Sequence, residues 1–169
     1  MAKRQQKNGQ YIAWFKDIKK NDDFLVGKQH ADFGRLHKSV SKKEMNLLDG
    51  FALTTTAYWE FLKTHNIDKK IKGMLKEVDI RNVVELKKIG KNIRNLILEK
   101  DLPNNVQKAL IKSYKKLHKR YGAVMIRPSV ASKNTPKESF AGQQDSFLNI
   151  TTEKALLHAV KRCIASLFS

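Results

Sequence analysis

The sequence predicts an α+β fold in which a short mixed sheet packs against several amphipathic helices. Residues 83–97 and 106–117 repeat apolar side chains at steps of three and four, the spacing that lines one face of a helix. Short apolar runs at 123–126 and 147–150 stand beside turn residues and predict strands. With 169 residues, of which 41% are hydrophobic, the chain is long enough for one domain with its own core.

Four elements are predicted in the first third of the folded segment, which covers 11–169. Residues 1–10 are basic and polar and are predicted to form a disordered tail. The Asp-Gly pair at 49–50 is a turn signal before an apolar strand, and Thr55 or Thr56 is expected to cap the next helix. In chain order, the expected elements are a strand within 11–18, a helix over 32–40, a strand within 47–54 and a helix ending near 64.

Three long helices and a pair of strands are predicted in the rest of the chain. Pro103 breaks the helical pattern between the first two helices, and Gly122 is expected to end the second in a left-handed cap. Thr151 or Thr152 is expected to cap the last helix. The predicted apolar faces hold Val83, Leu86, Ile89, Ile93, Leu96 and Ile97 in the first helix, Val106, Leu110, Tyr114 and Leu117 in the second, and Leu156, Ala159, Val160, Ile164 and Leu167 in the third.

The charge of the chain is strongly positive. Lys and Arg number 34 against 16 acidic residues, which gives a formal net charge of +18. Such an excess attracts polyanions, so nucleic acid, an acidic protein and an anionic membrane surface are all candidate partners. Because the lysines recur along most of the chain instead of forming one block, a solvated lysine-rich surface is the plainer interpretation.

Cysteine and histidine usage excludes several classes of site. The single cysteine, Cys163, rules out an intramolecular disulfide and a cysteine-rich metal site, and it is expected to be a small buried hydrophobe. The five histidines are scattered, so neither a metal site nor a catalytic residue is predicted, and His37, His65 and His118 are expected on solvated surfaces. The apolar runs are too short to cross a bilayer, and a cytoplasmic location is expected.

Arg127 and the glycine-centred loop after it are the candidates for ligand binding. Arg127 follows a predicted strand, where a guanidinium can hold phosphate oxygens in a bidentate fork. Gly142 would let backbone amides approach a phosphate. An arginine after a strand can equally be a surface residue, and a glycine in such a loop can simply make a turn.

Four segments of the chain resemble one enzyme family. They read YIAWFKDIKKNDDFLV at 11–26, GKQHADFGRL at 27–36, GFALTTTAYWEFL at 50–62 and RPSVASKNTPKESFAGQQDSFLNI at 127–150. Together they resemble the N-terminal nucleotide-binding region of the phosphoenolpyruvate synthase and pyruvate phosphate dikinase family. The resemblance covers about residues 11–169 and is most specific in the last segment.

The resemblance implies the first part of an ATP-grasp domain that binds ATP. The full enzyme of this family converts ATP, pyruvate and water into AMP, phosphoenolpyruvate and phosphate. The family pattern implies that Arg127 contacts the nucleotide phosphates and that the following loop covers them with backbone donors. The residues implied for that loop are Ala141, Gly142, Gln143, Gln144 and Asp145.

The chain departs from the family pattern at the site itself. The family's phosphate-contacting lysine aligns with Gln29, and Lys28 takes the place of a glycine. Pro128 replaces a serine and removes a backbone donor, while Lys133-Asn134 replaces a Glu-Asp pair. We therefore expect weak ATP binding that depends on Arg127, with Mg²⁺ entering only with the nucleotide.

The resemblance also sets an expectation for activity. The metal-ligand half of the ATP-grasp, the phosphohistidine domain and the pyruvate domain of the family have no counterpart in these 169 residues. A truncated, non-catalytic segment is therefore expected, with the remainder of a synthase as a candidate partner chain. The alternative is a degenerate basic module that binds a polyanion.

Overall fold

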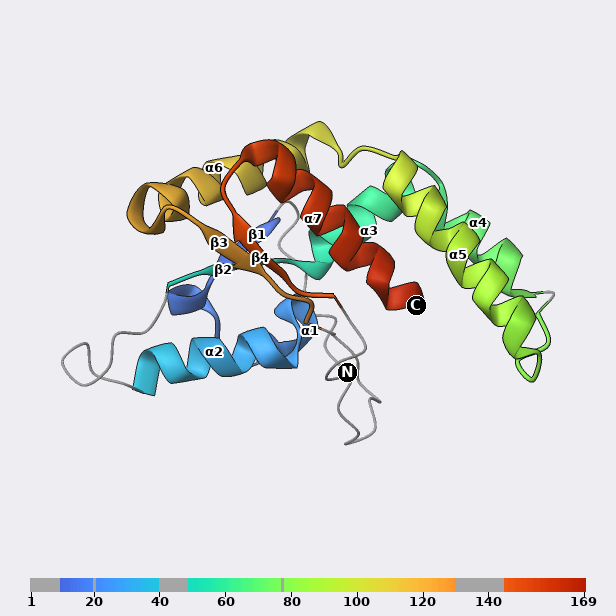
Figure 1. The fold of residues 1–169 in the computed structure, drawn as a ribbon. Helices are drawn as coiled ribbons and strands as arrows, with labels where there is room; N and C mark the ends of the chain where they lie inside the picture. The colour runs from blue at the N-terminus through green and yellow to red at the C-terminus, as the bar shows by residue number, and fades with distance from the viewer. Residues whose placement is uncertain (1–9, 20, 40–48, 77, 130–144) are drawn as a thin grey trace.

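The computed structural model describes residues 10–19, 21–39, 49–76, 78–129 and 145–169. These residues form an α+β fold, as predicted, with helices around two pairs of short strands (Figure 1). In chain order, the elements are β1 (Ile12–Trp14), α1 (Asp23–Val26), α2 (Lys28–Ser39), β2 (Phe51–Leu53), α3 (Thr55–Thr64), α4 (Ile67–Lys76), α5 (Val83–Glu99), α6 (Asn104–Tyr121), β3 (Val124–Ile126), β4 (Phe147–Ile150) and α7 (Glu153–Ala165). Two 3₁₀ turns, Phe15–Asp17 and Ser166–Phe168, follow β1 and α7.

The strands form two antiparallel pairs where a single mixed sheet was expected. Strand β1 pairs with β2, and Ala13 lies opposite Ala52. Strand β3 pairs with β4, and Ile126 lies opposite Phe147. Each strand has three or four residues, and among the described residues each one pairs with a single neighbour. In Figure 1 the strands lie centrally, between α2 on one side and α6 and α7 on the other.

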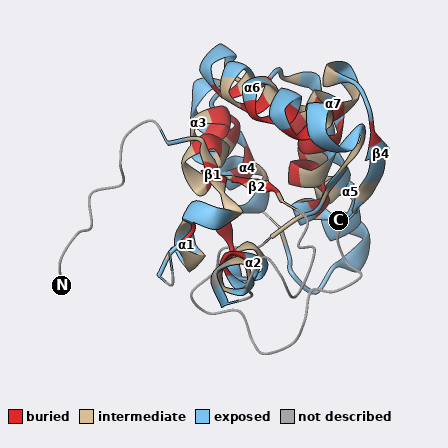
Figure 2. Cartoon of the chain, turned by 90° about the vertical axis from the view of Figure 1, so that its left-hand side faces the viewer, coloured by how far each residue is buried: buried red, intermediate tan, exposed pale blue. Residues whose placement is uncertain are grey.

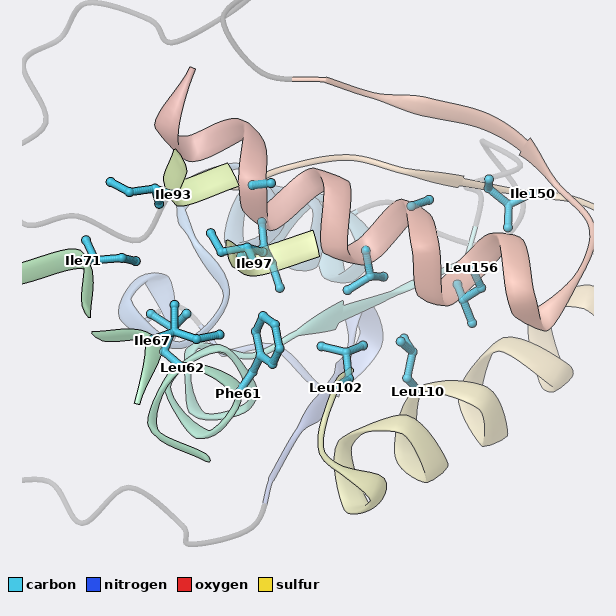
Figure 3. Packing of buried hydrophobic residues seen from close by; sticks show 14 of the residues in the cluster. Phe61, Leu62, Ile67, Ile71, Ile93, Ile97, Leu102, Leu110, Ile150 and Leu156 are labelled. Atoms are coloured by element: carbon cyan, nitrogen blue, oxygen red, sulfur yellow. The ribbon is translucent and has the colours of Figure 1, made fainter. Parts of the chain in front are cut away.

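The main hydrophobic core joins the helices that follow β2. Phe61 from α3, Ile67 from α4 and Ile97 from α5 are all fully buried, and Figure 3 shows their side chains meeting beneath α7. Leu110 and Leu156 extend this core beneath the second strand pair. Burying an aliphatic or aromatic side chain of this size stabilises a fold by about 1.5–3 kcal/mol. The cluster therefore fixes the helical scaffold on which the strand pairs rest.

Helix caps mark one end of each of three helices, α3, α6 and α7. Thr54 caps α3 by accepting a hydrogen bond from the Ala57 amide at 3.4 Å, so the prediction of Thr55 or Thr56 was wrong. Of the three consecutive threonines, Thr54 has the extended backbone that a cap requires. Thr152 caps α7 as predicted, accepting from the Ala155 amide at 3.1 Å. Gly122 ends α6 with a φ of 74°, the predicted left-handed cap.

Three helices differ from the sequence prediction, and the four-residue helix α1 is one of them because no helix was expected before residue 32. Helix α2 begins at Lys28 instead of near 32, because Gly27 turns the chain directly from α1 into it. Helix α4 was not predicted, although Ile67 and Ile71 are buried on one face of it.

Part of the predicted apolar faces is exposed. In the first turn of α5, Val83 is 60% exposed, because that end of the helix extends past the core. Leu167 is 41% exposed because α7 ends at Ala165 and the chain continues into a 3₁₀ turn. Figure 2 shows how burial is concentrated where the helices meet and how their outer faces are exposed.

Three histidines expected on solvated surfaces are half-buried instead. His65 Nε2 lies 2.9 Å from the Asp101 carbonyl, and the His118 ring stacks on Tyr114 at 5.3 Å. His37 Nε2 lies 3.9 Å from an Asp49 carboxylate oxygen. His65 and His37 contact residues from other parts of the chain, which local sequence patterns do not show, whereas His118 packs on a residue one turn earlier in its own helix.

Candidate functional site

A cavity of about 760 Å³ lies between the two strand pairs. Most of its wall is apolar and comes from α3, α6 and α7, with β2 and β3 contributing on either side. The polar part of the wall includes His30, Arg127 and Ser129. The cavity thus brings the start of α2 together with the residues that follow β3.

Gly27 and Ser129 make the closest contact between these two segments. Gly27 is buried and has φ 79° and ψ 156°, a conformation that essentially only glycine adopts. A Cβ atom at Gly27 would lie 2.5 Å from the Ser129 carbonyl oxygen and closer still to its Oγ. The His30 amide donates to Ser129 Oγ at 3.4 Å. Backbone therefore packs on backbone where α2 begins.

In the first turn of α2, the His30 amide donates to Ser129 Oγ, while the Lys28 and Gln29 amides make no hydrogen bond to the residues that the structure describes. The first four N–H groups of a helix have no intrahelical acceptor, and the positive end of the helix dipole lies beside them. The first intrahelical bond is made by Ala31, whose amide donates to the Gly27 carbonyl at 3.0 Å. The first turn of α2 contains no acidic residue. An anion at this end of α2 would therefore meet backbone donors and no carboxylate from the first turn of α2 itself.

Lys28 and Gln29 occupy the first turn of α2, and both are exposed. Successive residues on a helix point about 100° apart, so the Lys28 ammonium cannot take the direction of the Gln29 side chain. The structure therefore places Lys28 and Gln29 next to Gly27, which contacts the segment that holds Arg127, and their two side chains point in different directions.

His30 is held as a neutral ring beside Arg127. Burial lowers its pKa, the positive charge of Arg127 lowers it further, and the contact with the Val26 carbonyl opposes both. Its Nδ1 lies 3.2 Å from the Val26 carbonyl oxygen, which can only accept, so Nδ1 carries the proton and donates. Sequence reasoning left His30, Gly27 and Ser129 out of the site, because their role depends on a contact between segments about a hundred residues apart.

Arg127 and Asp145 lie at the same end of the second strand pair. Arg127 is exposed and follows directly after β3, as predicted. Because Ile126 lies opposite Phe147, Asp145 is near this end of the ladder, and its carboxylate is 3.8 Å from Arg162 Nη2 on α7. The other residues predicted for the loop, Ala141, Gly142, Gln143 and Gln144, lie outside the described residues.

Cys163 lines the same cavity, and its thiol is held in the protonated, weakly reactive form. Burial, and then the negative charge of Asp145, raise the pKa of its thiol to about 11. A thiol with this pKa is protonated at neutral pH and is a poor nucleophile. Among the described residues, no three His, Cys, Asp or Glu side chains gather closely enough to hold a metal ion. No helix of the described chain is both long and apolar enough to cross a membrane.

The polar wall of the cavity holds an arginine, a residue from the start of a helix and a serine, which are groups of the kind that bind phosphate in proteins. Comparison with protein families gives the particular class, because the model described as "Pyruvate phosphate dikinase, AMP/ATP-binding domain" matches residues 24–169. The match covers most of the chain, and the chain therefore belongs to this family.

Curated relatives agree with this assignment. The chain is 34% identical over 163 residues to the phosphoenolpyruvate synthase of Helicobacter pylori, covering 94% of this chain and 20% of that protein. It is 31% identical over 166 residues to the phosphoenolpyruvate synthase of Synechocystis, with the same coverage. A probable phosphoenolpyruvate synthase of Methanothermobacter thermautotrophicus is 33% identical over 162 residues, covering 94% of this chain and 23% of that protein. The chain thus spans about a fifth of the length of these relatives.

Proposed function

We propose that this chain binds the phosphates of ATP where the start of α2 meets the residues that follow β3. The observation that carries the proposal is the backbone contact between Gly27 and Ser129, with His30 bonded to the Ser129 hydroxyl. On this proposal, the Lys28 and Gln29 amides and the Arg127 guanidinium would face one phosphate group, and the Gly27–Ser129 contact supports it because it joins their two segments. Membership of a family described as an AMP/ATP-binding domain supports a nucleotide as the ligand.

The proposed chemistry is the binding of negative charge by fixed positive groups. Arg127 would hold two phosphate oxygens in a bidentate fork, and the Lys28 and Gln29 amides would donate to the same group. Neutral His30 adds no second positive charge beside Arg127, which limits charge repulsion before a nucleotide binds. The loop residues from Ala141 to Asp145 are proposed to add backbone donors from the opposite side.

Mg²⁺ is proposed to arrive on the nucleotide, because this ion is commonly bound through substrate phosphates and a few carboxylates. In a full-length synthase, the site would serve the conversion of ATP, pyruvate and water into AMP, phosphoenolpyruvate and phosphate. The role proposed for the residues of this chain is to position and neutralise the phosphates, with no catalytic group among them.

Calorimetric titration with Mg-ATP tests the proposal, with Arg127→Ala as the diagnostic variant. A charge-assisted hydrogen bond contributes about 1.5–3 kcal/mol, so the variant should bind about ten-fold to a hundred-fold more weakly. Arg81→Ala removes the same charge from an exposed position outside the cavity lining and should leave ATP affinity unchanged. Gln29→Lys should tighten binding by restoring the cation of the family pattern. Equal losses in Arg127→Ala and Arg81→Ala would show that net charge explains the binding and would overturn the proposal.

A further inference from the structure

Helix α6 carries a basic face that the nucleotide site does not use. The helix holds six Lys and Arg residues and no acidic residue. All six are exposed. Five of them are lysines, namely Lys108, Lys112, Lys115, Lys116 and Lys119. At 100° per residue, these five lysines fall within an arc of about 100°. The sequence pattern suggested evenly spread lysines, but the fold aligns this group along one helix.

The basic face lies opposite the side of α6 that enters the core. Val106, Leu110 and Leu117 are buried and fix the rotation of the helix. The lysines of the basic face are exposed from Lys108 to Lys119, and Figure 2 shows exposed turns of α6 at the top of the view. Lys108 and Lys119 are about 16 Å apart along the axis, and lysines four residues apart are about 6 Å apart. A row of this kind suits a partner with regularly repeated negative charges.

Few carboxylates neutralise this face. Among the described residues, the ion pairs that α6 makes within 4.0 Å are Lys115 with Glu153 at 3.0 Å and Arg120 with Asp49 at 4.0 Å. Glu60, near the start of the helix, is occupied by the Tyr11 hydroxyl at 2.6 Å and by Asn105. The positive charge of the central lysines is therefore left for a partner.

A shallow hollow with an aromatic wall adjoins the same lysines. It has a volume of about 320 Å³, and Lys112, Lys116, Ser113 and Trp14 line it. Trp14 is half-buried on β1, packs at 5.4 Å from Phe51 and has the Lys116 ammonium 5.8 Å from its ring centre. An aromatic face beside a row of cations is the combination that holds a base and the backbone of a single strand.

We infer that the α6 face, defined by Lys108, Lys112, Lys116, Lys119 and Trp14, binds single-stranded nucleic acid. The lysines contact successive phosphates, and a base stacks in the hollow against Trp14, displacing the Lys116 ammonium toward the backbone. Membrane-surface helices set large apolar side chains beside their cations. On α6 the exposed large apolar side chain is Tyr121, at the end of the helix and beyond the lysine row. The observations therefore favour a nucleic acid over a lipid surface.

Fluorescence anisotropy with a labelled oligothymidylate of about 20 nucleotides tests the lysine row. The double variant Lys112→Gln with Lys116→Gln should lose two phosphate contacts. Because each contact contributes about 0.7 to the steepness of log affinity against log salt concentration, the slope should become shallower by about 1.4. Affinity at about 0.1 M salt should then fall by about 25-fold. Lys87→Gln with Lys88→Gln removes the same charge from exposed positions on α5 and should change affinity much less. Equal losses in the two double variants would overturn the inference.

Trp14→Leu tests base stacking, with inorganic polyphosphate as a polyanion without bases. The variant should weaken oligothymidylate binding by about five-fold or more and leave polyphosphate binding unchanged. Equal effects on both ligands would mean that Trp14 only supports the fold and would overturn the nucleic-acid assignment. The nucleic-acid assignment would also be overturned if loss of Lys112 and Lys116 weakened binding to phosphatidylglycerol vesicles more than it weakened binding to the oligonucleotide. Arg127→Ala should bind the oligonucleotide normally, which separates this face from the ATP site.

Discussion

Replacing Gly27 with alanine tests the contact on which the candidate site depends. The φ of 79° and ψ of 156° cost a non-glycine residue about 1–3 kcal/mol. The added Cβ would also lie 2.5 Å from the Ser129 carbonyl oxygen, and overpacking of this kind costs about 1–3 kcal/mol. We therefore expect Gly27→Ala to lower the free energy of unfolding by about 2–6 kcal/mol.

Two other glycines separate backbone strain from the clash. Gly122 has a φ of 74° but open space around its missing Cβ, so Gly122→Ala should cost only the strain, about 1–2 kcal/mol. Gly73 lies within helix α4 and also has open space, so Gly73→Ala should stabilise the protein by about 0.5–1 kcal/mol. Urea denaturation of the three variants gives the comparison. A Gly27→Ala variant no less stable than Gly122→Ala would refute the close packing of Gly27 on Ser129.

Two further predictions concern ionisable groups in the cavity wall. Because folding lowers the pKa of His30 from 6.5, the unfolded chain binds more protons than the folded chain at pH values between the two pKa values. The free energy of unfolding should therefore fall as the pH drops below about 6.5. His30→Gln should flatten this part of the stability profile, and an unchanged profile would contradict the burial of the ring. The Cys163 thiol, whose pKa is about 11 against an ordinary 9.0, should hold about 100-fold less thiolate at pH 8 than an exposed thiol. Iodoacetamide should label Cys163 correspondingly slowly, and labelling at the rate of a small free thiol would show that the cavity wall is open.

Local patterns in the sequence predicted most of the scaffold. Pro103 and Gly122 mark the ends of α6 because each limits the backbone directly, and the apolar spacing around Leu110 gives its buried face. Helix α4 was missed because four lysines and Gly73 separate its few apolar residues, although Ile67 and Ile71 have helical spacing. Its stability comes from packing against the core, which a local pattern does not reveal.

Among the residues of the candidate site, Arg127 carries a signal of its own in the sequence, whereas Lys28, Gln29 and Asp145 were expected only from the family resemblance. Arg127 follows a strand and can be found from the chain alone. The contact between Gly27 and Ser129, and the burial of His30 beside them, depend on how two distant segments pack. The shared face of the α6 lysines was likewise not predicted, because the spread of lysines along the whole chain does not show which of them lie on one side of a helix.

The most direct test of the proposed ATP site is a nuclear magnetic resonance titration of the ¹⁵N-labelled chain with Mg-ATP. The largest changes in amide chemical shift are expected at two sets of residues, because these amides surround the proposed phosphate position. The sets are Lys28, Gln29 and His30 at the start of α2, and Arg127 and Ser129 after β3. Shifts concentrated on the lysines of α6, with none at the start of α2, would contradict the account. ATP would then be one more anion on the basic helix.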